Sequence, residues 1–464
     1  MKKVSEILFM KNILYFFFVY MILEGVLRKW FFPIFSNEIY FIKDILLIVI
    51  YVLALKQNLI FNTKYSKIFV FIILLISLYG FFGYEFNKNG IVSYFLGLRS
   101  YWLYLPLTLI IINVFDKNDL IKFFKLNLYF VLPYFVLIIL QAKLPESSIL
   151  NSGYQGNLFN PERPSGYFTY TTQNTYYFLF LFLCLCSFIL SKKELTKKDI
   201  ILLSILNILL FAIMILLKSR AVYVYVFTTI IYTSFFLIFS KIELKIKLKK
   251  IFLILLVSII SFNVLSKTVL EEETKYSTVR INTDTYYEML IVTENENRQI
   301  NLNLKIPFLD KKIFVINDTI MGYCSKYSSL CRIMNELYIA PAYKEASIIG
   351  KGIGAGTRLN VLYNKLKYFE LGETENLRMV MELGSVVGPI LIFSKVLIVI
   401  IMNFYALYRF REIKNLIFIP IVIFLSVQIL IGPITYTTSF ISFIFWFSLG
   451  LFFLAFNDKK QTNV

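Results

Sequence analysis

Apolar runs long enough to cross a membrane recur from one end of this chain to the other. A transmembrane helix needs about 20 predominantly apolar residues to span the hydrocarbon core of a bilayer. Hydrophobic residues make up 58% of the 464, and the mean hydropathy is +0.70. A soluble protein of this length could not bury so much apolar surface, so we predict an all-α polytopic membrane protein.

Hydropathy predicts about twelve transmembrane helices and no cleavable signal peptide, because a charged segment around Glu24 and Arg28 follows the first run. The predicted spans are residues 12–23, 40–55, 67–83, 98–114, 126–142, 174–190, 199–217, 220–240, 250–265, 379–403, 415–432 and 435–456.

Lysine alternates between the two sides of these spans. Lysines precede the first span, follow each even-numbered span as far as the tenth, and close the chain, whereas the intervening short connections carry few. Under the positive-inside rule both termini are therefore cytoplasmic. This distribution also explains the net charge of +19 without a basic domain that would bind nucleic acid.

The same rule places one large segment, residues 266–378, on the outer side. We predict three parts: helices 1–9 within residues 1–265, an outer loop domain at 266–378, and helices 10–12 within 379–464. The loop is polar, contains strand-like runs such as residues 312–316, and is large enough to cap the membrane surface.

Arginine is distributed differently from lysine. Of eleven arginines, two are predicted inside and four lie in the large loop. The other five lie at or beside the outer ends of spans: Arg28, Arg99, Arg163, Arg220 and Arg378. A guanidinium binds phosphate bidentately and stays charged at any working pH, so these arginines are candidates for a diphosphate site. The alternative is that they reach lipid phosphates or pair with carboxylates such as Glu24 and Glu162.

The segment before the sixth span, residues 143–173, contains prolines and glycines that rule out a regular helix. It brings Arg163 and several Tyr and Thr hydroxyls to the head of that span. Such side chains suit sugar rings. An interfacial tyrosine belt accounts equally well for the composition.

The exit of the large loop carries the strongest signal. A glycine-rich run, Gly350–Asn360, lies outside and lacks the Lys-Ser/Thr ending of a P-loop, so it favours close backbone approach. Glu375, Arg378 and Glu382 then share one helical face. Glu375, at the membrane edge, is a candidate general base, and Glu382, two turns further in, is expected to hold Arg378 or the helix in place. A structural Glu–Arg pair is the alternative.

Two glycines in the same run, Gly384 and Gly388, form a small-xxx-small pair that lets a neighbouring helix approach closely. Cys184 and Cys186 are expected to be packing residues, and Cys324 and Cys331 of the outer loop are either free thiols or a disulfide pair.

The chain contains no histidine, and its acidic residues show no metal-ligand spacing. We therefore expect neither a metal nor another cofactor.

Four segments in order resemble the O-antigen polymerase and ligase superfamily of bacterial polysaccharide assembly. They are EGVLRKWFFP around Arg28 with Lys43-Asp44 after it, RPSGYFTYTTQN, KSRAVYV from Lys218, and GIGAGTRLN followed by ENLRMVMELGSVVG. Members of that superfamily have about twelve spans and a large periplasmic loop between spans nine and ten.

The resemblance implies transfer of a glycan from a polyprenyl diphosphate carrier at the periplasmic face of the bacterial inner membrane. Arginines would hold the diphosphate and a base would take the proton of the acceptor hydroxyl. Ligases of this superfamily carry an essential histidine near the loop exit, where this chain has Glu373 and Glu375. That difference favours a repeat-unit polymerase, with Glu375 preferred as the base and Glu373 as the alternative.

Such a polymerase would act on lipid-linked donor and acceptor glycans, among membrane lipids, beside a flippase and a chain-length regulator. Two other functions remain open. One is a transporter or flippase of the same lipid-linked glycan, and the other is a related transferase, an O-antigen ligase or a protein O-oligosaccharyltransferase.

Overall fold

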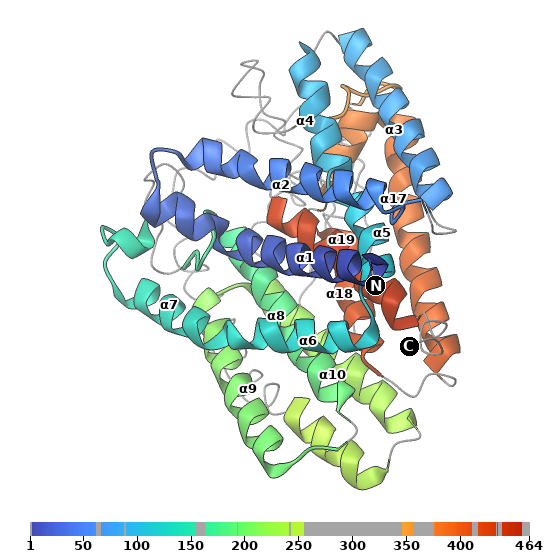
Figure 1. Cartoon of the computed structure of the whole chain (residues 1–464). Coiled ribbons are helices and arrows are strands. Elements are labelled where there is room, and N and C mark those ends of the chain that lie inside the picture. Colours follow the sequence, from blue (N-terminus) through green and yellow to red (C-terminus); the bar gives the residue numbers. More distant parts are fainter. Residues whose placement is uncertain are drawn as a thin grey trace, which may run out of the picture.

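The structure, a computed structural model, describes residues 2–61, 66–87, 90–153, 163–192, 194–240, 243–254, 346–356, 375–410, 416–432, 434 and 439–456. Within these ranges the regular elements are helices (Figure 1). Seven of the helical stretches are long and apolar enough to cross a membrane, so the chain is an α-helical membrane protein.

The described helices overlap the predicted spans, but most of the ninth predicted span, residues 250–265, lies outside the described residues. The number of twelve spans stays a prediction. The first half contains α1 (Lys2–Val26), the π-helix η1 (Leu27–Phe31), α2 (Ser36–Lys56), α3 (Ser66–Asn87), α4 (Gly90–Trp102), α5 (Leu105–Val114), α6 (Lys117–Tyr129) and α7 (Val131–Lys143). The second half contains η2 (Ile149–Asn151), α8 (Thr171–Ser191), α9 (Lys197–Leu217), α10 (Arg220–Phe239), α17 (Glu375–Phe410), α18 (Phe418–Ile431) and α19 (Ser439–Phe456).

Helices α8, α18 and α19 form the centre of the bundle, with α19 packed against α5 and α18 against α8 (Figure 1). Most residues of α8 and α19 are buried, including the free thiols of Cys184 and Cys186, which are packing residues as predicted. Outer helices such as α3 and α9 expose apolar faces, as a bundle surrounded by lipid does. Cys324, Cys331 and residues 312–316 lie outside the described residues.

The segment before α8 is irregular, as its prolines and glycines predict. It packs onto the end of α1, where a Cβ on Gly25 would lie 2.2 Å from the Tyr167 carbonyl oxygen. Gln141 and Asn174 hydrogen-bond the backbone of Gly166 and Pro164 respectively. The ring of Tyr167 is buried beside Tyr134, so it serves packing rather than presenting a platform for sugars.

The most informative departure from the predicted spans lies in α17. Gly384 has φ 82° and ψ 173°, which breaks the helix into two arms, residues 375–383 and 385–410. A Cβ on Gly388 would lie 2.6 Å from Cα of Val380, and the Lys395 ammonium donates to Asn376 Oδ1 at 2.9 Å. A continuous helix would hold these partners far apart, so the chain reverses at Gly384 and the two arms pack together.

Candidate functional site

Two groups of buried polar side chains flank α4. The first surrounds Tyr40 of α2. The Lys43 ammonium lies 3.3 Å from the centre of the Tyr40 ring, and the guanidinium carbons of Arg28 and Arg99 lie 4.8 and 4.9 Å from it. Three cations from η1, α2 and α4 therefore share one aromatic ring, an arrangement in which each cation meets the negative face of the π system.

Two carboxylates belong to the same group. Glu24 accepts from Arg28 Nη1 at 2.8 Å and from Lys43 at 3.0 Å, and Asp44 accepts two bonds from Arg99, at 2.7 and 3.1 Å. We call these six residues (Glu24, Arg28, Tyr40, Lys43, Asp44 and Arg99) the Tyr40 cluster. With three cations and two carboxylates, it carries one net positive charge.

Local sequence explains the cluster. Tyr40 and Asp44 are four residues apart on α2, and Glu24 and Arg28 are four apart at the end of α1, so each pair projects from one side of its helix. Arg28 also donates to the carbonyl and hydroxyl oxygens of Ser36, which holds the turn between the two helices. Arg28 thus pairs with the carboxylate of Glu24, which is the alternative to a diphosphate site that the sequence left open.

The second group lies on the first arm of α17. Arg378 is fully buried between two carboxylates: its Nη2 lies 3.3 Å from Glu375 Oε2 and its Nη1 lies 3.6 Å from Glu382 Oε1. The spacing of three and four residues puts all three on one helical face, as predicted. We call Glu375, Arg378 and Glu382 the Arg378 cluster. It carries two negative charges and one positive charge.

Glu382 is held from three sides. It accepts from the Tyr101 hydroxyl at 2.9 Å and from the backbone N–H of Gly356 at 3.0 Å, and it faces Arg378. This supports the expectation that Glu382 orients Arg378. The reversal at Gly384 puts Glu382 next to the turn and brings the start of the arm, where Glu375 lies, alongside Lys395. The depth of the two carboxylates in the membrane stays a prediction.

Gly350 to Gly356 belong to a strap, residues 346–356, that closes over the break in α17. Gly350, Gly352 and Gly354 all have positive φ, which favours glycine. The N–H groups of Lys351 and Gly352 donate to the carbonyls of Met381 and Glu382 at 2.9 Å each.

Ile353 of the strap fills a notch between α3 and α4. A Cβ on Gly80 would meet its side chain at 2.6 Å, and a Cβ on Gly97 would meet its backbone at 2.5 Å. The glycine-rich run therefore approaches other backbone closely, as predicted. Gly384 and Gly388 also allow close approach, as predicted. Their partners are the strap and the first arm of α17, where a neighbouring helix was expected.

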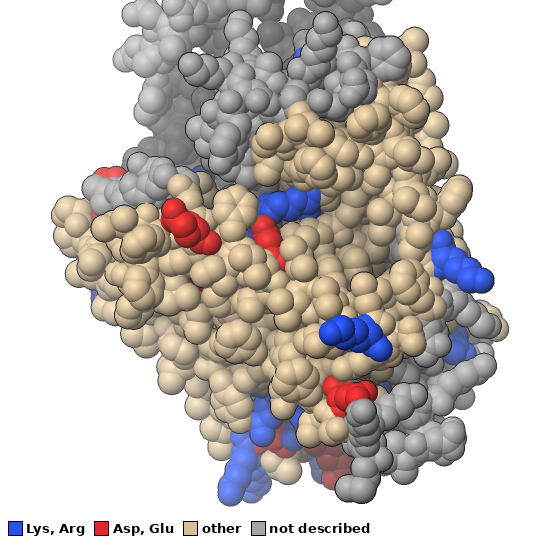
Figure 2. Space-filling model, turned by 45° about the horizontal axis from the view of Figure 1, so that its top comes forward, with Lys and Arg blue, Asp and Glu red and all other residues tan. Residues whose placement is uncertain are grey.

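Helix α4 connects the two clusters. Arg99 and Tyr101 are two residues apart, so they point to different sides of α4, Arg99 to Asp44 and Tyr101 to Glu382. Figure 2 shows a face of the molecule that is mostly uncharged, with a basic and an acidic side chain beside each other near its middle and further charges at its lower edge.

The structure brings together two of the five predicted arginines, Arg28 and Arg99, in the Tyr40 cluster and places a third, Arg378, in the other cluster. Arg163 is exposed before α8, and Arg220 is the first residue of α10, its side chain lying outside the described part. Glu373 also lies outside it. Within the described residues, no group of three or more Cys, Asp or Glu side chains is arranged to hold a metal ion.

Sequence reasoning did not assign roles to Tyr40, Tyr101, Lys29 or Lys395. Lys29 is buried and donates to Ser165 Oγ at 3.0 Å and to the Gly166 carbonyl at 2.7 Å, so it fastens the segment before α8 to η1. Lysines and carboxylates inside apolar spans, such as Lys43 and Lys395, were the available signal, because a charge at that position is costly unless it is paired or functional. The aromatic partners carried no such signal.

Comparison of the chain with protein-family models, with characterised proteins and with solved structures gave no match.

Proposed function

We propose that the chain is a polymerase that joins polyprenyl-diphosphate-linked oligosaccharide repeat units at the periplasmic face of the bacterial inner membrane. The observation that carries the proposal is the pair of clusters on the two sides of α4. One has excess positive charge, which suits a diphosphate, and the other has excess carboxylate, which suits removal of a proton. In this proposal the chain spans the membrane twelve times with both termini cytoplasmic.

The reaction assigns one task to each cluster. Arg28, Lys43 and Arg99 stabilise the diphosphate as it leaves with its polyprenyl chain, because its negative charge grows while its bond to the anomeric carbon breaks. The acceptor hydroxyl oxygen forms the new bond to that carbon. Its proton passes to Glu375, whose carboxylate is oriented by Arg378, and Glu382 holds Arg378 from the other side.

The test compares three variants in the native host. Glu375→Gln removes the base at almost constant shape, Arg378→Lys keeps the charge but loses the planar fork, and Glu146→Gln changes an exposed carboxylate as the control. We expect Glu375→Gln to abolish long surface glycan chains while single-repeat material remains, and Glu146→Gln to leave the chain-length ladder unchanged. An unaltered ladder in Glu375→Gln would contradict the assignment.

A transporter of the same lipid-linked glycan is the second candidate, and the break at Gly384 favours it, since discontinuous helices line the substrate sites of many transporters. The same experiment separates the two. A transporter variant would keep its polymer length distribution but export glycan slowly, whereas a polymerase variant would accumulate single repeats outside. Product attached to lipid A-core or to protein by the purified chain would instead indicate one of the related transferases.

A further inference from the structure

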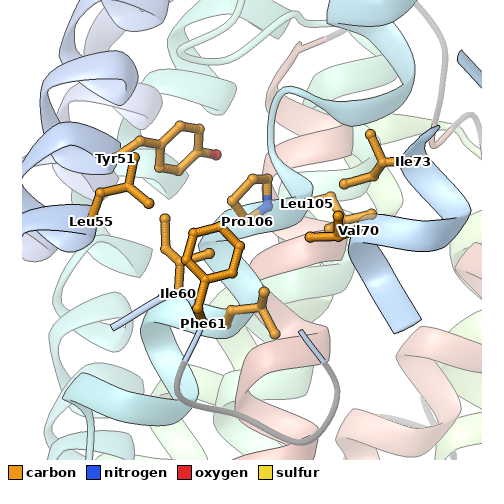
Figure 3. A pocket seen from close by; sticks show the side chains of 9 residues that line it. Tyr51, Leu55, Ile60, Phe61, Val70, Ile73, Leu105 and Pro106 are labelled. Carbon is orange, nitrogen blue, oxygen red and sulfur yellow. The ribbon is translucent and has the colours of Figure 1, made fainter. Parts of the chain in front are cut away.

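An apolar cavity of about 230 Å³ opens between α2, α3 and α5, away from both charged clusters (Figure 3). It is lined by Tyr51, Leu55, Ile60, Phe61, Val70, Ile73, Leu105, Pro106 and Leu109. The one polar side-chain atom in this lining, the Tyr51 hydroxyl, donates to the Leu103 carbonyl, so the ring of Tyr51 contributes apolar surface. The cavity therefore suits a hydrocarbon chain and nothing charged.

The cavity and the Tyr40 cluster lie along the same side of α2. Residues 40, 44, 51 and 55 are spaced so that they fall on one helical stripe, with Tyr40 and Asp44 in the cluster and Tyr51 and Leu55 in the cavity wall. At about 1.5 Å per residue, Tyr51 lies about 10 Å along the helix axis from Asp44. Ile48, which is exposed, lies between them on this stripe.

The second wall of the cavity, formed by α5, is also connected to the Tyr40 cluster along the chain. Arg99 of α4 belongs to the cluster, and the chain then passes through Leu103, which accepts from Tyr51, to Leu105, Pro106 and Leu109 in the cavity. Figure 3 shows Pro106 and Leu105 from this wall, Val70 and Ile73 from α3, and Tyr51 and Leu55 from α2 around the same space. A cationic site and an apolar cavity therefore lie along the same two neighbouring segments, α2 and α4–α5.

We propose that this cavity binds the isoprenoid tail of a polyprenyl diphosphate whose head group lies at the Tyr40 cluster. The proposal rests on the proposed function for the head group and adds a site for the tail. Charge favours this occupant over a free hydrocarbon, because only an amphiphile with an anionic head fits both ends.

The experiment measures binding, without turnover, of the purified full chain in detergent to farnesyl diphosphate, undecaprenyl diphosphate and inorganic diphosphate. Val70→Trp fills the cavity, and Leu75→Trp places the same side chain on an exposed, opposite face of α3 as a control. We expect Val70→Trp to weaken undecaprenyl diphosphate about tenfold and to leave inorganic diphosphate unchanged. Leu75→Trp should change neither.

Equal weakening of all three ligands, or no change in Val70→Trp, would overturn the tail site. The tail site would also be overturned if phosphatidylglycerol competed as strongly as undecaprenyl diphosphate. That result would make the cavity a site for phospholipid chains. A photoreactive undecaprenyl diphosphate on the unmodified chain gives a second readout, since crosslinks should map to α3 and α5. Failure of the polymerase proposal looks different: tail-dependent binding would persist while no polymer forms.

Discussion

The two charged clusters beside α4 are built in opposite ways. The Tyr40 cluster draws three cations and two carboxylates from α1, η1, α2 and α4 around one aromatic ring. The Arg378 cluster takes all its charges from one short helical arm, with two carboxylates around one arginine. The first gathers distant residues into a positive site, and the second uses helical spacing to make a negative one.

The difference teaches what each cluster depends on. The Tyr40 cluster keeps its shape as long as three helices stay packed. The geometry of the Arg378 cluster comes from helical spacing, but its position comes from the strap, from Tyr101 and from the reversal at Gly384. Variants that disturb the strap should therefore displace the Arg378 cluster and leave the Tyr40 cluster unchanged.

Replacing Arg378 with alanine should produce the largest effect. It leaves Glu375 and Glu382 buried without the cation between them, which typically costs about 3–5 kcal/mol of stability. We expect a much lower unfolding temperature together with loss of long glycan chains. Arg99→Ala, whose partner Asp44 is part-buried, should destabilise the chain less; a larger loss for Arg99→Ala would reverse the ranking of the two clusters.

Gly80→Ala tests the strap. The new Cβ would meet the Ile353 side chain at 2.6 Å, so we expect destabilisation of about 1–3 kcal/mol from overpacking and a shorter glycan ladder, because Glu382 shifts with the strap. Adding Ile353→Ala to this variant should restore much of the stability and of the glycan chain length. The same second change should not rescue Gly97→Ala, which meets the Ile353 backbone. Rescue in both pairs would show that the notch does not hold the strap by these contacts.

Tyr40 tests the positive cluster. Tyr40→Phe removes the hydroxyl that accepts from Arg99 at 3.2 Å and from Ser439 at 3.0 Å but keeps the ring, and we expect a loss of about 1–2 kcal/mol. Tyr40→Leu removes the ring as well and should cost more, because three cations lose their π partner. Thermal unfolding measures both. Equal losses would mean that the ring itself contributes little.

The smallest effect should come from outside both clusters. Asp116 begins α6, where its carboxylate accepts from the N–H of Asp119 and meets Lys11. Burial opposes the charged form, but these contacts outweigh it and hold the pKa of Asp116 below the ordinary 3.8. Its stabilisation is therefore complete above pH 3.8 and is lost as the pH falls through the lowered pKa.

Asp116→Ala should cost about 1 kcal/mol at neutral pH, the usual effect of losing an N-cap. The difference in unfolding free energy from the parent should shrink as the solution is acidified, and the glycan ladder should stay unchanged. A difference that grows in acid would contradict the lowered pKa.

Several features were accessible from the chain alone because they depend on neighbours in sequence. Apolar run length predicted helices where helices lie, and prolines and glycines predicted the irregular segment before α8. The spacing of Glu375, Arg378 and Glu382 predicted their ion pairs, since positions three and four apart share a helical face. The glycine-rich run correctly indicated close backbone contact.

Other features needed the tertiary structure. Hydropathy treated residues 379–403 as one span, because the apolar residues at the end of the first arm of α17 continue into the apolar second arm and one glycine marks the reversal. The partners of the outer arginines were also hidden: Arg99 reaches Asp44 across 55 positions. The place of the arginines at helix ends made them candidates for a site, but it did not indicate that Arg163 would be exposed.

The sequence by itself determined that this is a helical membrane protein and which residues share a helix face, because hydropathy and helical periodicity act over a few turns. Only the tertiary structure decided that Tyr40 collects three cations, that Gly384 folds Glu375 back beside Lys395, and that α2 joins a charged site to an apolar cavity. These arrangements arise from packing between segments far apart in the chain. Ser439 and Tyr40, which hydrogen-bond across 399 positions, show that distance most clearly.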